Sequence, residues 1–385
     1  MLRRLRALVR RSRHDAQPHV ALPRVDALTG PALDRWVQEA DLEAMLGDVG
    51  HPVLGTTAQL RLLTRLTHDR LADLSVAARA RVIAALQTGA TLSVAERAVA
   101  RVFEATTGEE DLRLLRNLCD GDGTHQDLAK LVFSDVDDAA VRTRILDHIA
   151  AHVGEHGGLK ILSDVDDTLV ANLKDRHYPR GTIYPGAVAL YTALDLGPAS
   201  TPNPMGDVTF VTARPSDPFG FFESGTHRMV RARGIGSATV LSGSLLSLLT
   251  HGSMASKKVE NVREYVQLFP DYGIVFLGDN GQGDVEVAER IVAAWPEAVR
   301  AVYIHAVLPV RPGERERLAR LGVTLIDTHV GAAVHARGLG LLSDEQVREV
   351  AADARKGIDA VTFADADAER QARAELDRDL AAAGL

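Results

Sequence analysis

Cysteine is almost absent from this sequence, with Cys119 the only one among 385 residues. A single thiol excludes a disulfide within the chain, and it also excludes a zinc site built on cysteines. Such sparse use of cysteine is typical of a reducing compartment, and we therefore expect a cytoplasmic protein.

Basic charge and long apolar runs are also lacking. The 52 acidic residues outnumber the 44 lysines and arginines, which gives a formal net charge of -8 at pH 7. Domains that bind nucleic acid usually carry a basic surface, so we expect no nucleic-acid partner. No uninterrupted apolar run approaches the roughly 20 residues of a membrane-spanning helix, so we expect no transmembrane span.

Hydrophobic residues, by contrast, make up 46% of the chain, which is enough for a sizeable core and for two domains. Apolar residues recur at helical spacing from about residue 31 onward, and capping boxes predict helix starts at 93–96 and 343–346. The predicted regions are a mobile basic segment at 1–30, a helical domain at 31–157, an α/β domain at 158–342 and C-terminal helices at 343–385.

The first residues, MLRRLRALVRRSR, are basic and contain no acidic side chain. Their leucines recur at helical spacing, which favours a helix that settles on anionic lipid and holds the protein at the periphery of a membrane. The composition is also compatible with a mitochondrial presequence or with a solvated start that binds nothing. The sequence indicates no particular protein partner.

Short apolar runs separated by helical segments dominate the region after residue 158. Strands that alternate with helices predict a parallel sheet with helices on both faces, and such sheets bind ligands at the carboxyl ends of their strands. The runs lie at 159–163, 208–211, 239–241, 274–277, 299–304 and 323–326.

The pentapeptide Ser-Asp-Val-Asp-Asp occurs twice, at 134–138 and at 163–167. The second copy follows an apolar strand, which places Asp164 on the loop beyond a strand end. The first copy lies between two helical patterns, where Asp135 and Asp137 are predicted to cap the following helix. We therefore interpret the first copy as structural and the second as chemical.

The stretch Asp-Val-Asp-Asp-Thr at 164–168 supplies groups that hydrolysis of a phosphate ester needs. Asp164 can attack phosphorus and form an aspartyl-phosphate, while Asp166 can protonate the leaving alcohol and then activate water. Thr168 can hold the loop by a side-chain hydrogen bond, and we count it among the residues around the phosphate. An anionic nucleophile that attacks an anionic ester needs a metal ion, and Mg²⁺ prefers oxygen ligands.

Cationic and hydroxyl groups follow along the chain. Thr212 comes directly after the run at 208–211, where its hydroxyl could bind a phosphoryl oxygen. Lys257 and Lys258 are both candidates for neutralising the phosphate, and adjacent helix residues point about 100° apart. Arg214 either clamps a phosphate or pairs with a nearby carboxylate, and the sequence favours neither.

Two further aspartates follow the apolar run at 274–277. Asp279 would complete the metal site, and Asp284 would support or share it. Each of these groups could separately be a surface residue or an acidic turn. Their fixed order, with most of them at predicted strand ends, favours a catalytic site.

Together these residues resemble the four motifs of the haloacid dehalogenase superfamily, or HAD superfamily. Within it, SDVDDTL, VTFVTARP and KKVENVREYVQLFPDYGIVFLGDNGQGDVEV look like the actin-patch phosphatidate phosphatase family, with the lipin catalytic region as a more distant relative. The likeness covers about residues 159–310, and GDNGQGD is its most specific part. It implies a HAD-like Rossmannoid α/β fold with a small or absent cap, preceded by an all-α N-terminal region.

The resemblance also implies roles for individual residues. Asp164 would be the nucleophile and Asp166 the acid and base, while Thr212 and Lys258 would bind phosphate. Mg²⁺ would be held by Asp164, by the backbone carbonyl of Asp166 and by Asp279. The sequence departs from the family at Ala213-Arg214-Pro215 where Ser-Pro is frequent, at Asn280 in place of a serine and at Lys257 in place of a histidine.

The sequence therefore favours a Mg²⁺-dependent phosphatase that acts on phosphatidate or a related phospholipid. One alternative is a HAD phosphatase of a soluble phosphomonoester. Another is a catalytically weak scaffold that binds lipid or protein, although such a scaffold would be expected to lose at least one of the motif residues.

Overall fold

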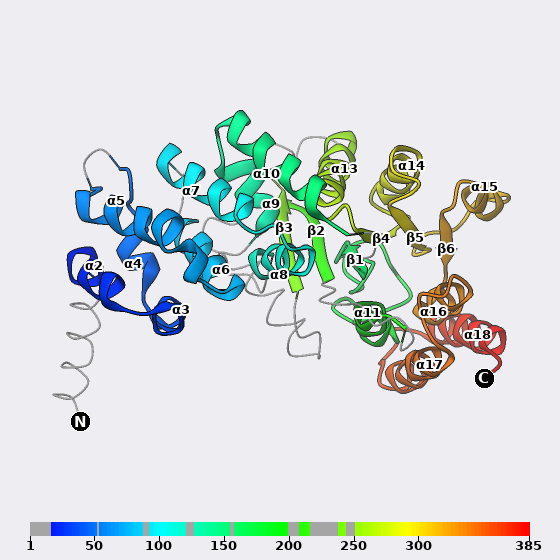
Figure 1. The fold of residues 1–385 in the computed structure, drawn as a ribbon. Coiled ribbons are helices and arrows are strands. Elements are labelled where there is room, and N and C mark those ends of the chain that lie inside the picture. The colour runs from blue at the N-terminus through cyan, green and yellow to red at the C-terminus, as the bar shows by residue number, and fades with distance from the viewer. Residues whose placement is uncertain are drawn as a thin grey trace, which may run out of the picture. The chain divides into compact units, whose positions relative to one another are not determined.

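The computed structural model describes residues 17–51, 54–87, 92–120, 127–154, 158–198, 208–215, 238–243 and 251–385. Within these ranges, the side chains of 211–215, 238–243 and 251–254 are not described. The chain divides into two compact units, Met1–Gly154 and Glu155–Leu385, which Figure 1 colours from blue to red along the sequence.

The described part of the first unit is entirely helical, as the sequence predicted for the N-terminal region (Figure 1). Residues 18–27 fall in the segment expected to be mobile, but they form a helix that Pro18 begins. The elements are α2 (Pro18–Ala27), α3 (Gly30–Glu39), α4 (Leu42–Leu46), α5 (Thr57–Thr64), η1 (Arg65–Asp69), η2 (Leu71–Asp73), α6 (Val76–Leu86), α7 (Ser93–Glu104), α8 (Glu109–Cys119), α9 (Leu128–Lys130), η3 (Leu131–Asp135) and α10 (Ala139–His152).

The capping box predicted at the start of α7 is wrong. Leu92 is the N-cap and makes no side-chain capping bond. Glu96 is only 3% exposed and instead accepts hydrogen bonds from the backbone N–H groups of Asp137 (3.3 Å) and Asp138 (3.1 Å). These two residues directly precede α10. A contact across about forty residues of sequence has replaced the local one.

The first copy of the pentapeptide is structural, but its caps are not the ones predicted. Asp138 is the N-cap of α10, and its carboxylate accepts from the N–H groups of Ala140 (2.8 Å) and Val141 (3.3 Å). Asp135, predicted as a cap, ends η3 and pairs with Lys130 at 2.6 Å. This copy stabilises a helix start in the first unit.

The second unit contains a six-stranded sheet of order β3-β2-β1-β4-β5-β6, in which all neighbouring strands are parallel. The predicted α/β architecture is therefore confirmed. This doubly wound order reverses between β1 and β4, the point where such sheets bind ligands. The strands are β1 (Gly158–Ser163), β2 (Val208–Pro215), β3 (Ala238–Gly243), β4 (Tyr272–Asp279), β5 (Val299–His305) and β6 (Thr324–Ile326).

Helices cover both faces of this sheet. In Figure 1, α13, α14 and α15 lie on one face, and α11 and α16 lie on the other with α17 and α18 behind them. None of the described helices is both long and apolar enough to cross a bilayer. The helices are α11 (Ala187–Leu196), α13 (His251–Leu268), α14 (Asp284–Ala294), α15 (Glu314–Arg320), α16 (His329–Gly338), α17 (Asp344–Asp359) and α18 (Ala366–Ala383).

The C-terminal helices belong to the core of the second unit. Val330 in α16 and Val350 in α17 are fully buried in one apolar cluster with Ile161 of β1. The capping box predicted at the start of α17 is confirmed, because Ser343 and Gln346 exchange hydrogen bonds with each other's backbone. The amide of Gln346 also donates to the carbonyl of Gly197 at 2.9 Å, which ties α17 to the end of α11. These contacts place α16 and α17 in the core that lies against the sheet.

Candidate active site

Two aspartates lie where the strand order reverses. Asp164 directly follows β1, and Asp279 is the last residue of β4, the neighbouring strand. The N–H of Asp164 donates to the carbonyl of Leu277 at 2.9 Å, which continues the β1–β4 pairing one residue beyond β1. This bond brings both carboxyl groups to the same edge of the sheet.

A third carboxyl group joins them from the first residue of α14, Asp284. Its Oδ2 accepts the N–H of Asp279 at 3.3 Å. The approach requires Gly278, because a Cβ atom at that position would lie 2.6 Å from the Asp284 carboxylate. Ligand oxygens of Asp164, Asp279 and Asp284 lie within 4.8 Å of one another, and these residues are only 5%, 0% and 0% exposed.

Lys258, from α13, supplies a cation to this carboxylate cluster. Its Nζ lies 2.6 Å from Asp284 Oδ1 and 3.3 Å from Asp164 Oδ1, and the residue is 5% exposed. Burial alone would lower the pKa of Lys258, but the charges of Asp164 and Asp284 outweigh burial and raise it. Lys258 is therefore charged. The neighbouring Lys257 is less buried than Lys258.

The carboxylate cluster carries more negative charge than Lys258 balances. Three carboxylates and one ammonium group leave a net charge of -2 when all are ionised. Burial raises the pKa of Asp164, and Lys258 opposes this only in part. Burial and the charge of Asp284 raise the pKa of Asp279. A divalent cation would cancel this excess, and carboxylate oxygens suit a hard cation, so the residues present fit a metal ion.

Asp167 fixes the loop that leaves β1. Its φ of 62° lies in the left-handed region, which aspartate tolerates better than most residues. Its buried carboxylate accepts from the backbone N–H groups of Asn172 (2.8 Å), Leu173 (3.0 Å) and Lys174 (2.6 Å). Three backbone donors to one carboxylate thus stabilise the turn of the chain between residues 167 and 174.

Asp166 is oriented by neighbouring amide groups. Asn172 Nδ2 donates to Asp166 Oδ1 at 2.6 Å, and Asn172 Oδ1 in turn accepts from Arg180 Nε at 2.7 Å. The backbone carbonyl of Asp166, which the family resemblance gave to the metal, accepts from Gln282 Nε2 at 3.2 Å. The same amide lies 3.3 Å from Asp279 Oδ2, so Gln282 joins two of the predicted metal-binding groups.

Thr168 does not make the hydrogen bond that the sequence predicted for it. The residue is 1% exposed, and its hydroxyl has no hydrogen-bond partner among the described residues. The loop is held by the Asp167 carboxylate instead. The carboxylate of Asp167 is charged, whereas the hydroxyl of Thr168 is neutral. The carboxylate is therefore the stronger acceptor for the three backbone N–H groups.

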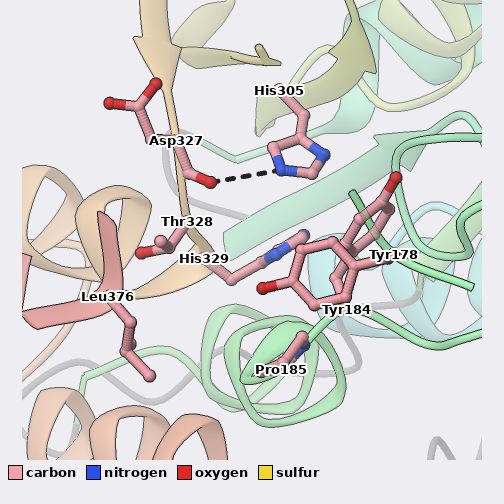
Figure 2. A pocket seen from close by; sticks show the side chains of 8 residues that line it. All are labelled: Tyr178, Tyr184, Pro185, His305, Asp327, Thr328, His329 and Leu376. Atoms are coloured by element: carbon pink, nitrogen blue, oxygen red, sulfur yellow. Dashed lines mark hydrogen bonds between the residues drawn. The ribbon is translucent and has the colours of Figure 1, made fainter. Parts of the chain in front are cut away.

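A small cavity lies at the carboxyl ends of β5 and β6 (Figure 2). His305, at the end of β5, places Nδ1 3.0 Å from the carbonyl of Asp167 and Nε2 3.3 Å from that of Asp327. His329 also lines the cavity. Burial, and to a lesser extent the nearby His305, lowers the pKa of His329 to about 3. Neither of its nitrogens has a well-aligned partner among the described residues, although the backbone of Thr168 lies close. The volume of about 10 Å³ suits one water molecule.

Two of the predicted phosphate-binding residues, Thr212 and Arg214, have side chains outside the described residues. Their backbone lies in β2, which extends to Pro215 and so runs beyond the predicted end at Val211. The pairing with β3 shifts register between Val211 and Pro215. Thr212 therefore lies in the irregular end of the strand, at the edge of the sheet that carries Asp164.

Sequence reasoning did not assign Asn172, Gln282 or a positioning role to Asp167. No role was assigned to His305 either, and this residue is buried. A usable signal existed for His305, because it ends an apolar strand just as Asp279 does. No such signal marked Asn172. Gln282 lies within the GDNGQGD motif, but its contact with Asp166 depends on the fold of two separate loops.

Comparison with known proteins gives one family. No curated protein and no solved structure matched the chain. Residues 159–306, which run from β1 to just beyond β5 and carry the whole carboxylate cluster with Lys258, match the family described as the catalytic domain of phosphatidate phosphatase APP1.

Proposed function

We propose that this protein is a Mg²⁺-dependent phosphatase of phosphatidate or a related phospholipid, and that it works through an aspartyl-phosphate on Asp164. The observation that carries the proposal is the buried cluster of Asp164, Asp279, Asp284 and Lys258 at the reversal point of the sheet. The family match at 159–306 supports a phosphatase, and the substrate class rests on that family.

The first step would transfer the phosphoryl group to the protein. An oxygen of Asp164 attacks phosphorus, a bond from Asp164 to phosphorus forms, and the bond from phosphorus to the lipid alcohol breaks. Asp166, held by Asn172 at 2.6 Å, gives its proton to the departing oxygen. Lys258 stays beside Asp164 and neutralises charge on the phosphoryl oxygens.

The second step would release phosphate. Asp166, now ionised, takes a proton from water, whose oxygen attacks phosphorus as the bond to Asp164 breaks. Asp164, Asp279 and the carbonyl of Asp166 would hold Mg²⁺, with Asp284 in support, and the bound ion supplies electrostatic stabilisation of the phosphoryl oxygens. Thr168, Thr212 and Arg214 remain proposed neighbours of the phosphate.

Phosphate release tests the proposal. The substrates are dihexanoyl phosphatidate dissolved as monomers, long-chain phosphatidate in dispersions and p-nitrophenyl phosphate, each with and without MgCl₂. The duplicated pentapeptide offers a matched pair of variants, since Asp164→Asn removes the proposed nucleophile and Asp135→Asn changes the equivalent residue of the structural copy.

We expect Mg²⁺-dependent release from both phosphatidates, lost in Asp164→Asn and retained in Asp135→Asn. Release from p-nitrophenyl phosphate alone would keep the catalytic residues and refute the lipid substrate. Equal activity of Asp164→Asn and wild type on every substrate would refute Asp164 as the nucleophile.

A further inference from the structure

The loop after Asp167 presents unusual side chains to solvent beside the carboxylate cluster. Leu173 is 52% exposed, which is high for a leucine on a loop whose backbone is held by three hydrogen bonds. Three basic side chains follow it in the sequence, and all three are exposed. They are Lys174, Arg176 and Arg180.

The acidic residue of this loop does not offset that charge at the surface. The side chain of Asp175 is only 3% exposed. Its carboxylate accepts from the hydroxyl of Tyr184 at 2.8 Å and from the N–H of His177 at 2.7 Å. The loop therefore shows three positive charges to solvent and keeps its one negative charge inside.

A second exposed leucine lies next to this loop. Leu308 follows β5, is 36% exposed, and exchanges two hydrogen bonds of 2.8 Å with the side chain of Asn280. Gly281, the next residue, lies against Lys174, because a Cβ atom at Gly281 would be 2.9 Å from Lys174 Cγ. The loops after β1, β4 and β5 thus adjoin one another at the edge of the sheet that carries Asp164.

Leucines are also exposed at the opposite edge of the sheet, which provides a comparison. Leu196 ends α11 and is 60% exposed, and Leu321 follows α15 and is 45% exposed. Both lie where a helix returns the chain toward the amino end of the next strand. Arg300 and Arg320 are exposed at that same edge.

We propose that Leu173, Lys174, Arg176, Arg180 and Leu308, together called the basic rim, dock the second unit on an anionic bilayer. The inference rests on the proposed function, because it explains how a recessed nucleophile reaches a lipid phosphate. Asp164 is 5% exposed, so the lipid headgroup must come to the edge of the sheet. Leucines at that edge enter the interface, and the cations bind anionic headgroups despite a net protein charge of -8.

The test compares long-chain phosphatidate in anionic vesicles with monomeric dihexanoyl phosphatidate. The rim variants are L173S/L308S and K174Q/R176Q, and the matched controls at the other edge are L196S/L321S and R300Q/R320Q. We expect L173S/L308S to lower turnover on vesicles about tenfold, since both leucines lose apolar contact with lipid. K174Q/R176Q should lower it about fivefold for each cation at low salt, and less as salt screens the charges.

Turnover of the monomeric substrate should stay within about twofold of wild type in all four variants, because every substituted side chain is exposed and none is assigned to the carboxylate cluster. An unchanged ratio of vesicle to monomer turnover in both rim variants would overturn the proposal, as would an equal fall in the controls. If wild type leaves dihexanoyl phosphatidate intact, the proposed function fails separately. Flotation with anionic vesicles then decides the rim, because rim variants must bind less vesicle than the controls.

Discussion

In the absence of a bound metal ion, the stability of this protein should fall as the pH rises. Burial is the main cause that raises the pKa of Asp164 to about 7 and that of Asp279 to about 8, against an ordinary value of 3.8. Between pH 3.8 and these values the folded protein keeps protons that the unfolded chain has released. The free energy of unfolding must therefore decline with rising pH through that window.

The size of the decline follows from the shift of one carboxyl group. A pKa raised from 3.8 to about 7 corresponds to about 4 kcal/mol once the pH exceeds the folded value. The two carboxyl groups titrate as a pair, so their shifts are not added. The proposed Mg²⁺ would bind the ionised carboxylates and should therefore restore stability, most strongly at the alkaline end of the window.

Denaturation midpoints in urea, followed by circular dichroism with EDTA or with MgCl₂ from about pH 5.5 to about pH 8.5, measure this effect. Asp279→Asn removes one negative charge from the cluster. It should stabilise the metal-free protein at the alkaline end and abolish the gain from Mg²⁺, while Asp137→Asn in the structural pentapeptide should change neither. A midpoint in EDTA that is flat or rises with pH would refute the charge argument.

Three substitutions test other contacts. Asn172→Ala should lower kcat on p-nitrophenyl phosphate about tenfold at an unchanged melting midpoint, because Asp166 loses the hydrogen bond from Asn172. Steady-state kinetics and a thermal melt measure both quantities, and an undiminished kcat would contradict the prediction. Gly278→Ala should weaken Mg²⁺ binding in calorimetric titrations, because its methyl group would lie 2.6 Å from Asp284, and wild-type affinity would contradict this reasoning. Glu96→Gln should cost about 1 to 2 kcal/mol in urea denaturation, since two backbone N–H groups lose a charged acceptor, whereas the exposed Glu110→Gln should cost nothing measurable.

Much of the second unit could be predicted because each of its strands is marked by a signal within its own few residues. Strands of a parallel sheet are buried on both faces and appear as short apolar runs, so all six were found. Polar residues that follow such runs must gather at one edge of the sheet, so Asp164 and Asp279 could be predicted to lie together. Asp284 could be placed near them because it is only the fifth residue after Asp279.

Contacts between distant segments could not be predicted. Glu96 has the spacing of a capping box, yet it binds backbone N–H groups some forty residues away, because local capping competes with partners that only the fold supplies. Asn172 reaches Asp166 only after Asp167 has turned the chain with a positive φ. The pattern named Thr168 as the residue that holds this loop, and nothing local indicated that Asp167 would take its place.

The apolar core that includes α11 and the C-terminal helices determines where an expressed fragment of this protein should end. The segment that matches the family ends at residue 306, before β6 and before α16, α17 and α18. Yet Val330, Val350 and Leu380 from those helices are buried against the same core as Ile161. A fragment that stops at 306 would leave this face bare, and we expect it to aggregate. The segment that matches the family is thus shorter than the segment that we expect to be needed for folding. The latter runs to the end of α18.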